Sequence, residues 1–319
     1  MKNFSWRKVL LGAAILIAIG GLLVGNYFVT FALKRGSDSD PTAPPAACVN
    51  IVDPNRSAAD LPNVPHEEWE ITSEDGLTLR GTAFLPTEER KESAHRWVIM
   101  VHGYGRNQAF VWDYAEAYLG QGYRVLTPDL RAAGKSDGEY LTMGAMESRD
   151  LVKWAEKIVA TDPEAEISLH GVSMGGATVM MASALDIPHL YAVVEDCGYT
   201  GAYEMFAGQL TKLYGLPSFP IMNFVDVVAY LRTGFWVSDM APIKSVPATK
   251  VPMLFIHGDA DGLVPYHMMG ELFTASGAPH KEEMTVPGAG HADAKDAYPK
   301  AYFGRVFTFL AEQAPRENN

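Results

Sequence analysis

ISLHGVSMGG, residues 167 to 176, is the stretch that decides the fold of this chain. Its first residues are typical of a buried strand, and the segment after it, Ala177 to Leu185, is typical of a helix. Between them lies a G-x-S-x-G turn, so tight that a side chain at Gly171 or Gly175 would collide with a neighbouring element. We therefore interpret Ser173, at the tip of the turn, as a nucleophile.

Strand and helix patterns alternate on both sides of this turn, as in an α/β protein. An opening hairpin is predicted first, because two strand-like segments flank the turn signal Glu74-Asp75-Gly76. The repeated strand–helix units that follow predict a doubly wound, mostly parallel sheet with helices on both faces. The predicted strands are 67–72, 77–85, 97–101, 123–127, 166–170, 191–195, 253–257 and 281–286, and the last helix is 300–312.

The segment from Tyr199 to Lys250 interrupts the alternation with two helical stretches rich in aromatic residues and methionine. An insertion at this point lies over the carboxyl ends of the strands, where open α/β sheets bind ligands. We therefore predict a small helical cap, the alternative being an ordinary pair of packing helices. Phe206, Phe219 and Trp236 are expected to set substrate preference by acyl length without supplying catalytic groups.

A serine hydroxyl is a poor nucleophile at neutral pH, so Ser173 needs a base, and that base needs an orienting carboxylate. His291 lies in a glycine-rich loop directly after the last strand, where the turn would need its base. The loop after the penultimate strand offers Asp261 as the acid, with Asp259 as its rival. Asp196, at the end of the strand before the cap, is a third possibility.

The remaining polar residues at strand ends have simpler interpretations. His102, His170 and His257 each lie at a strand end directly before a glycine, which favours packed, hydrogen-bonded scaffold roles. Asp129 is interpreted as a structural group at the end of its strand. His267 opens a helix near the acid and is the serious competitor of His291.

Four ordered motifs carry a resemblance to a known family over about residues 67–313. They are Val101-His102-Gly103-Tyr104-Gly105, Gly171-Val172-Ser173-Met174-Gly175-Gly176, His257-Gly258-Asp259-Ala260-Asp261-Gly262-Leu263-Val264-Pro265 and Gly288-Ala289-Gly290-His291. Together they resemble the α/β-hydrolase superfamily, and more narrowly its bacterial esterase and serine-aminopeptidase-like branch. The G-x-S-x-G turn is then the nucleophile elbow of that fold. The resemblance implies that the second aspartate of the third motif, Asp261, is the triad acid.

The resemblance also implies an oxyanion hole. Acyl transfer passes through a tetrahedral oxyanion, which two preorganised backbone N–H donors stabilise. The geometry of the family assigns one donor to the residue after the nucleophile, Met174, and the other to Tyr104 in the loop after an earlier strand. The loop departs from the H-G-G-G pattern of some lipases, so their preference for bulky esters is not implied.

The implied activity is that of a serine carboxylesterase acting on small to medium, largely uncharged substrates through a Ser-His-Asp triad and an acyl-enzyme. A peptidase or amidase, or a thioesterase or lipase, would use the same triad, and a non-catalytic membrane-tethered binding protein would share the fold. We expect no cofactor and no metal. With 38 acidic against 26 basic residues the net charge is -12, which disfavours nucleic acid as a partner.

The N-terminal region carries no charged residue from Val9 to Leu33. As a helix, this run is long enough to cross a hydrocarbon core of about 30 Å. We predict a single-pass membrane anchor. Basic residues before the run slightly favour a cytoplasmic N-terminus, with the catalytic domain outside the cytoplasm. The alternative is secretion after cleavage of a signal peptide at Thr30-Phe31-Ala32, but the run is longer than the usual h-region.

The predicted division of the chain is a cytoplasmic stub and transmembrane segment over 1–35, a flexible linker over 36–65, and a hydrolase domain over 66–319 with its cap at about 199–250. Cys48 in the linker and Cys197 in a strand do not indicate a disulfide framework. Because the apolar run is expected to contribute nothing to the sheet, deletion of residues 1–35 is expected to release a soluble, active enzyme. The oligomeric state is left open.

Overall fold

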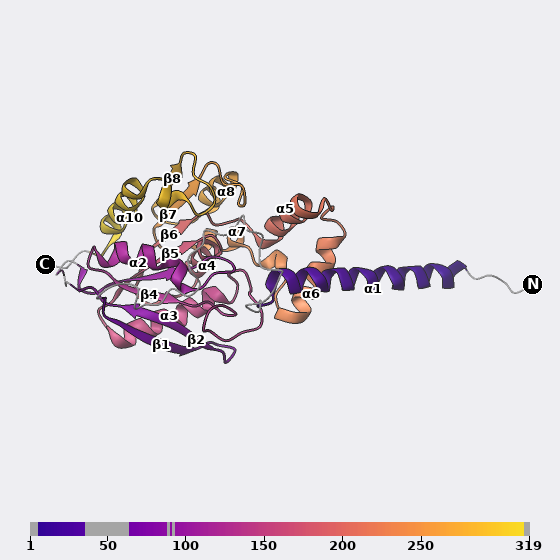
Figure 1. The fold of residues 1–319 in the computed structure, drawn as a ribbon, viewed down its shortest axis with the longest axis horizontal. Coiled ribbons are helices and arrows are strands. Elements are labelled where there is room, and N and C mark those ends of the chain that lie inside the picture. The colour runs from indigo at the N-terminus through magenta and orange to yellow at the C-terminus, as the bar shows by residue number, and fades with distance from the viewer. Residues whose placement is uncertain (1–5, 36–63, 88–89, 91–92, 316–319) are drawn as a thin grey trace, which may run out of the picture.

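The computed structural model describes residues 6–35, 64–87, 90 and 93–315 (Figure 1). The predicted linker, apart from its last two residues, lies outside the described residues, and so do Cys48 and the first five residues of the predicted cytoplasmic stub. All the elements on which the active-site prediction depends fall within the described part of the chain.

One eight-stranded sheet forms the centre of the molecule, in the order β1-β2-β4-β3-β5-β6-β7-β8. β1 pairs antiparallel with β2 and β2 pairs antiparallel with β4, whereas the other pairings are parallel, so β2 alone runs against the rest of this sheet. The predicted hairpin and mostly parallel sheet are confirmed. The strands are β1 (His66–Thr72), β2 (Thr78–Phe84), β3 (Arg96–Val101), β4 (Arg124–Pro128), β5 (Glu166–Val172), β6 (Leu190–Asp196), β7 (Met253–Gly258) and β8 (Lys281–Val286).

Helices cover both faces of the sheet, because side chains along each central strand alternate between two cores. In β3, for example, Trp97 and Ile99 point into one core and Val98 and Met100 into the other. The first core contains α3 (Glu147–Thr161), α4 (Met174–Ala182) and α8 (His267–Ala275), and the second contains α2 (Trp112–Leu119), α9 (Ala294–Ala297) and α10 (Pro299–Gln313), with η4 (Gln108–Val111).

The predicted cap region contains two helices, α5 (Ala202–Tyr214) and α6 (Ile221–Thr233), close to the expected stretches. Each helix ends at a glycine in the left-handed conformation, Gly215 after α5 and Gly234 after α6, which is the usual way to stop a helix. The chain then returns to β7 through η5 (Val237–Asp239), α7 (Pro242–Ser245) and η6 (Val246–Ala248).

The N-terminal helix α1 (Trp6–Leu33) projects from the cap end of the molecule (Figure 1). From Gly21 onward it packs against α6, where a Cβ on Gly21 would enter the ring of Phe224 and a Cβ on Gly25 would meet the Phe224 carbonyl oxygen at 2.6 Å. At its far end Leu33 is buried in the same core as the sheet. The apolar run adds no strand to the sheet, as expected, but it does contribute Val29 and Leu33 to the core that packs on the sheet.

The end of α1 is held by the loop that precedes α3. The Leu141 amide donates to the Leu33 carbonyl at 2.8 Å, and the Arg35 amide donates to the Glu139 carbonyl at 2.8 Å. The Arg35 guanidinium also donates to the carbonyls of Gly134 and Ser136, each at 2.6 Å. The bond from Leu141 satisfies one of the carbonyl groups that a helix leaves open at its C-terminus, and the bonds from Arg35 fix the end of α1 to the loop.

Candidate active site

The turn between β5 and α4 holds Ser173 at φ 59° and ψ -117°, a strained conformation for a residue with a side chain. A Cβ on Gly171 would collide with the Gly175 carbonyl oxygen, and a Cβ on Gly175 would collide with the Val101 carbonyl oxygen in β3. Both glycines are therefore required by close backbone approach, as the sequence indicated. The turn is forced into a shape that lifts the serine hydroxyl off the sheet.

The three residues predicted as the triad lie within hydrogen-bond distance of one another. The Ser173 hydroxyl is 2.8 Å from His291 Nε2, and His291 Nδ1 is 2.7 Å from Asp261 Oδ2. They come from the segments that follow β5, β7 and β8, so the parallel sheet brings three distant parts of the chain to one edge. This is the arrangement in which a histidine can take the serine proton while a carboxylate fixes its tautomer.

The side chain of Asp261 has no exposed surface, and four donors contact its carboxylate. Its Oδ1 accepts from the amides of Leu263 and Val264 at 2.8 and 2.9 Å, and its Oδ2 lies 3.2 Å from His257 Nε2 as well as next to His291. Burial by itself would raise the pKa of Asp261, but the hydrogen bonds from the two histidines outweigh it and hold this pKa well below its usual value. The carboxylate is therefore charged at neutral pH.

His257 contacts the candidate site, and its sequence motif did not indicate this contact. It was expected to be a packed scaffold residue, and it is indeed fully buried, but its ring also faces the acid. Burial lowers the pKa of His257, but the hydrogen bond to the charged Asp261 reverses that effect, so that the pKa is raised overall. Its position four residues before Asp261 was the only signal in the sequence.

The rival residues are engaged elsewhere. Asp259 is exposed and its Oδ1 accepts from the Gly288 amide at 2.6 Å. Asp196 accepts from the Tyr302 hydroxyl at 2.7 Å, and burial raises the pKa of Asp196 to about 6. His267 is exposed and its Nε2 lies 3.9 Å from a carboxylate of its own helix. The geometry favours Asp261 and His291 over all three.

Two buried histidines have the scaffold contacts expected of them. His102 Nε2 accepts from the Leu130 amide at 3.0 Å, so Nδ1 carries the proton and donates to the Gly103 carbonyl at 2.9 Å. His170 lies between two tyrosine hydroxyls, and burial lowers its pKa to about 3. Asp129 accepts from backbone amides, including that of Lys135 at 2.8 Å, in agreement with a structural role.

The two residues predicted to form the oxyanion hole lie beside the nucleophile. Met174 is the first residue of α4, so its amide belongs to the positive end of that helix. Tyr104 follows Gly103, which is so close to Ser173 that a Cβ on it would lie 3.4 Å from the Ser173 Cβ. Both predicted donors line one cavity with Ser173. Their role in stabilising an oxyanion stays a prediction.

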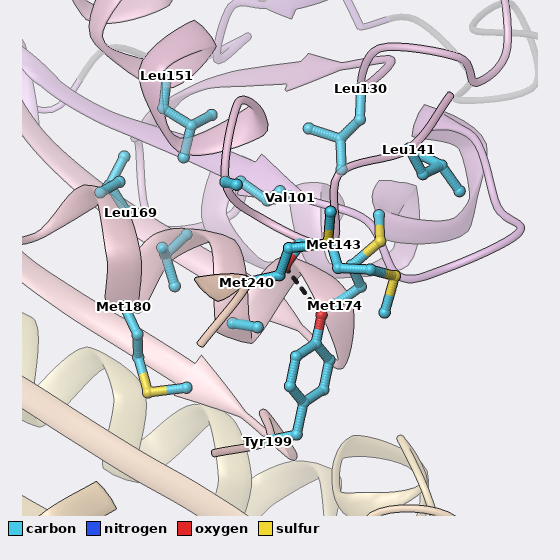
Figure 2. Packing of buried hydrophobic residues seen from close by; sticks show 14 of the residues in the cluster. Val101, Leu130, Leu141, Met143, Leu151, Leu169, Met174, Met180, Tyr199 and Met240 are labelled. Carbon is cyan, nitrogen blue, oxygen red and sulfur yellow. Dashed lines mark hydrogen bonds between the residues drawn. The ribbon is translucent and has the colours of Figure 1, made fainter. Parts of the chain in front are cut away.

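That cavity has a water-accessible volume of about 160 Å³. Its floor includes Met143, Met174 and Tyr199, and Figure 2 shows the Tyr199 hydroxyl bonded to the Met143 carbonyl, at 3.1 Å, among several other methionines. The remaining lining comes from α1, α5, α6 and the loop after β7: Phe28, Phe31, Ala32, Met205, Phe206, Gln209, Leu210, Leu213, Tyr214, Met222, Val225, Leu263 and Val264, together with Tyr104 and Ser173.

The cavity corrects part of the prediction for the cap. Phe206 lines it, as expected. Phe219, however, is 75% exposed, and Trp236 stacks on Tyr230 with ring centroids 4.5 Å apart. A single sequence cannot tell which side of a cap helix faces inward when both sides carry aromatic residues.

Comparison with known proteins gives one consistent picture. A family model described as "Alpha/beta hydrolase family" matches residues 98–303. The uncharacterized protein YqkD of Bacillus subtilis is 29% identical over 213 residues, which cover 66% of this chain and 68% of that protein.

Among solved structures, the Pyrococcus furiosus esterase Pf2001 has a TM-score of 0.67 at 23% identity, over 82% of this chain and 95% of that one. Est1E from Butyrivibrio proteoclasticus, solved with ferulic acid bound, has a TM-score of 0.60 at 21% identity, over 77% and 98% of the two chains. At these identities the solved structures show a shared fold.

Proposed function

The chain belongs to the alpha/beta hydrolase family, and on that premise we propose that it is a serine carboxylesterase with Ser173, His291 and Asp261 as its catalytic triad. The observation that carries the proposal is the continuous chain of hydrogen bonds from the Ser173 hydroxyl through the His291 ring to a buried, charged Asp261. Each residue is in the order along the chain and at the strand end that this chemistry needs.

The proposed reaction follows from these positions. His291 Nε2 takes the proton of Ser173 as its oxygen attacks the ester carbonyl, and Asp261 stabilises the imidazolium that forms. The amides of Met174 and Tyr104 stabilise the oxyanion. The imidazolium then protonates the departing alkoxide, which leaves an acyl-enzyme on Ser173. Water, activated by the same histidine, releases the acid and restores the serine.

The lining of the cavity favours esters over peptides. All 18 residues that line it are uncharged types, and most are apolar. An aminopeptidase needs an anionic partner for the free amino group of its substrate, because an unpaired ammonium group in an apolar site is costly. A thioesterase or a lipase would use the same triad and the same apolar cavity, so these remain the alternatives within the proposal.

We also propose that α1 is a retained membrane anchor. Among the described residues it is the helix that is long and apolar enough to cross a membrane. Cleavage after Ala32 would remove Phe28 and Phe31 from the cavity wall and Val29 from the core, which argues against a signal peptide. The proposed organisation has the hydrolase domain over 66–319, with the cap at 199–250, on the outer side of the membrane.

Substitution of the nucleophile tests the proposed activity. In Ser173→Ala we expect turnover of p-nitrophenyl esters to fall by at least about a thousandfold, because acyl transfer then has no nucleophile. A fluorophosphonate should label the wild-type chain at Ser173 and should not label the variant. Thermal unfolding serves as the control for folding. Full turnover in a folded Ser173→Ala protein, or faster cleavage of aminoacyl p-nitroanilides than of esters, would contradict the proposal.

A further inference from the structure

The anchor helix forms part of the substrate cavity. Phe28, Phe31 and Ala32 of α1 line the same cavity as Ser173. The Tyr104 hydroxyl donates to the Ala32 carbonyl at 2.8 Å, which ties the end of α1 to the loop predicted to carry an oxyanion donor. The segment proposed to lie in the membrane and the site proposed to do the chemistry therefore share a wall.

The length of α1 places this wall at the membrane surface. Residues 7–20 are exposed apart from the half-buried Gly12, but at 1.5 Å per residue they span only about 21 Å. A hydrocarbon core of about 30 Å needs about 20 residues, and counted from Val9, the first residue of the uncharged run, these end near Phe28. The part of α1 that packs on the cap must therefore lie within the membrane or at its surface.

The surface of the cap fits such a position. Outside α1, eight of the eleven exposed large hydrophobic residues in the described chain lie between residues 213 and 236. Exposed apolar side chains are therefore concentrated in the cap segment that includes α6, the helix against which α1 packs, and exposed apolar residues of this kind suit an interaction site. The eight are Leu213, Tyr214, Leu216, Phe219, Val227, Tyr230, Leu231 and Trp236.

A cation of the cap lies beside the part of α1 that packs on α6. Arg232 of α6 contacts Asn26, and its Nη1 lies 2.7 Å from the Tyr140 hydroxyl and 3.5 Å from the Thr30 hydroxyl. A guanidinium held between polar groups, with an apolar surface around it, is typical of the boundary between acyl chains and headgroups.

We propose that the substrate is a membrane-resident lipid ester whose acyl chain passes from the bilayer into the cavity beside α1. The proposal rests on the proposed esterase function and adds the substrate class and its route. The ester carbonyl reaches Ser173 from the membrane side, the C–O bond is cleaved with water, and the products are a fatty acid and the lipid alcohol. Phe28 and Phe31 contact the acyl chain next to the membrane.

The first test uses the full-length enzyme reconstituted in phosphatidylcholine vesicles. 4-Methylumbelliferyl palmitate is placed either in the same vesicles or in separate ones, and 4-methylumbelliferyl acetate in the water serves as the soluble substrate. We expect palmitate in the same bilayer to be cleaved at least about tenfold faster than palmitate in separate vesicles, because the chain enters from the bilayer. Equal rates in the two arrangements would overturn the proposed route.

The second test compares α1 variants in the same vesicles. Phe28→Ala and Phe31→Ala should each lower the ratio of palmitate to acetate turnover at least about fivefold, because each removes several contacts with the acyl chain. Leu23→Ala is the matched control, since Leu23 lies on the same helix and is 66% exposed. It should leave both rates unchanged. Fluorophosphonate labelling of Ser173 measures how much of each variant is folded and active.

The outcomes separate the two proposals. If acetate is cleaved and Ser173 is labelled, but the turnover ratio is the same in Phe28→Ala as in Leu23→Ala, the lipid proposal is wrong and the esterase proposal stands. If neither ester is cleaved and Ser173 is not labelled, the esterase proposal fails and the lipid proposal fails with it.

Discussion

At the scale of single residues, the contact of His257 with Asp261 makes the acid dependent on two histidines. His257 Nε2 lies 3.2 Å from Asp261 Oδ2, the same oxygen that receives His291. In the proposed mechanism Asp261 has to keep its orientation while His291 gains and loses a proton, and a second donor on the same oxygen restricts the rotation of the carboxylate. His257 is therefore a positioning residue in this site.

We expect His257→Phe, which keeps the ring but removes the donor, to lower kcat on a short soluble ester about tenfold. Loss of one hydrogen bond to a charged group is worth about 1.5 kcal/mol, and about 1.4 kcal/mol corresponds to a factor of ten in rate. His257→Gln retains an N–H donor and should restore most of the rate. Equal kcat in the two variants, with KM unchanged, would show that the ring only fills space.

The sequence predicted the triad because each member lies in a short motif at a strand end. Ser173 is marked by its two glycines, and His291 by the loop after the last strand. His257 lies in such a motif too, but a buried histidine before a glycine has a sufficient explanation as packing. Its contact with Asp261 depends on how the loop after β7 folds back over the strand, and no local pattern records that.

The burial of Glu195 should make the stability of the protein depend on pH. It is fully buried on β6, and burial raises its pKa to about 8 from an ordinary 4.5. Below pH about 4.5 the carboxyl is protonated in the folded and unfolded chains alike. Between about 4.5 and 8 the unfolded chain loses this proton while the folded chain keeps it, so the free energy of unfolding falls as the pH rises.

We expect Glu195→Gln to remove that part of the pH dependence. Relative to the variant, the wild type should lose a few kcal/mol of stability between pH about 5 and about 8, since one pKa unit is worth about 1.4 kcal/mol. The measurement is the denaturant midpoint of both proteins in detergent at several pH values, and titrating groups that do not interact with Glu195 cancel in the difference. A constant difference across this range would mean that Glu195 is already charged in the folded chain.

At the scale of elements, the packing of α1 on α6 depends on two glycines. A Cβ at Gly25 would lie 2.6 Å from a backbone oxygen of α6, which cannot move as a flexible side chain does. Small residues allow helices to approach this closely in apolar surroundings. The approach is what brings Phe28 and Phe31 to the cavity.

We expect Gly25→Leu to separate the two helices and to destabilise the cap by about 1 to 3 kcal/mol, the usual range for overpacking. Gly12→Leu is the control, because a Cβ at Gly12 meets nothing within 4 Å. Thermal unfolding in detergent and the palmitate-to-acetate turnover ratio are measured for both. If the two variants behave alike, the contact between α1 and α6 does not hold the cavity wall in place.

The strands of the sheet were predictable from sequence, but the role of α1 was not. The strands β3 to β7 are short, largely apolar runs bounded by turn residues, and each pairs with at least one strand of the same kind. α1 is apolar on every side, so its pattern does not distinguish the turns that face lipid from those that face protein. Only the contact with α6, a helix far along the chain, shows which turns of α1 face protein.

At the scale of the whole molecule, the anchor and the cap form one unit around the cavity. The proposed catalytic residues lie on loops of the sheet, but the cavity wall beside them includes a helix that begins near the N-terminus. A cut through the chain can therefore shorten the proposed membrane segment without damage to the cavity wall only before α1 meets α6 at Gly21.

Two truncations test this division. Deletion of residues 1–20 should leave a folded protein that cleaves short esters, because the part of α1 that packs against α6 begins at Gly21 and is retained. Deletion of residues 1–35 takes Val29 and Leu33 out of the core, and burial of each such side chain is worth about 1.5 to 3 kcal/mol. We therefore expect the longer deletion to unfold at a lower temperature and to lose its preference for long acyl chains, since Phe28 and Phe31 go with it. If the two truncated proteins have equal thermal midpoints and rank esters equally by chain length, α1 is only a tether. The cap helices alone would then form that side of the cavity.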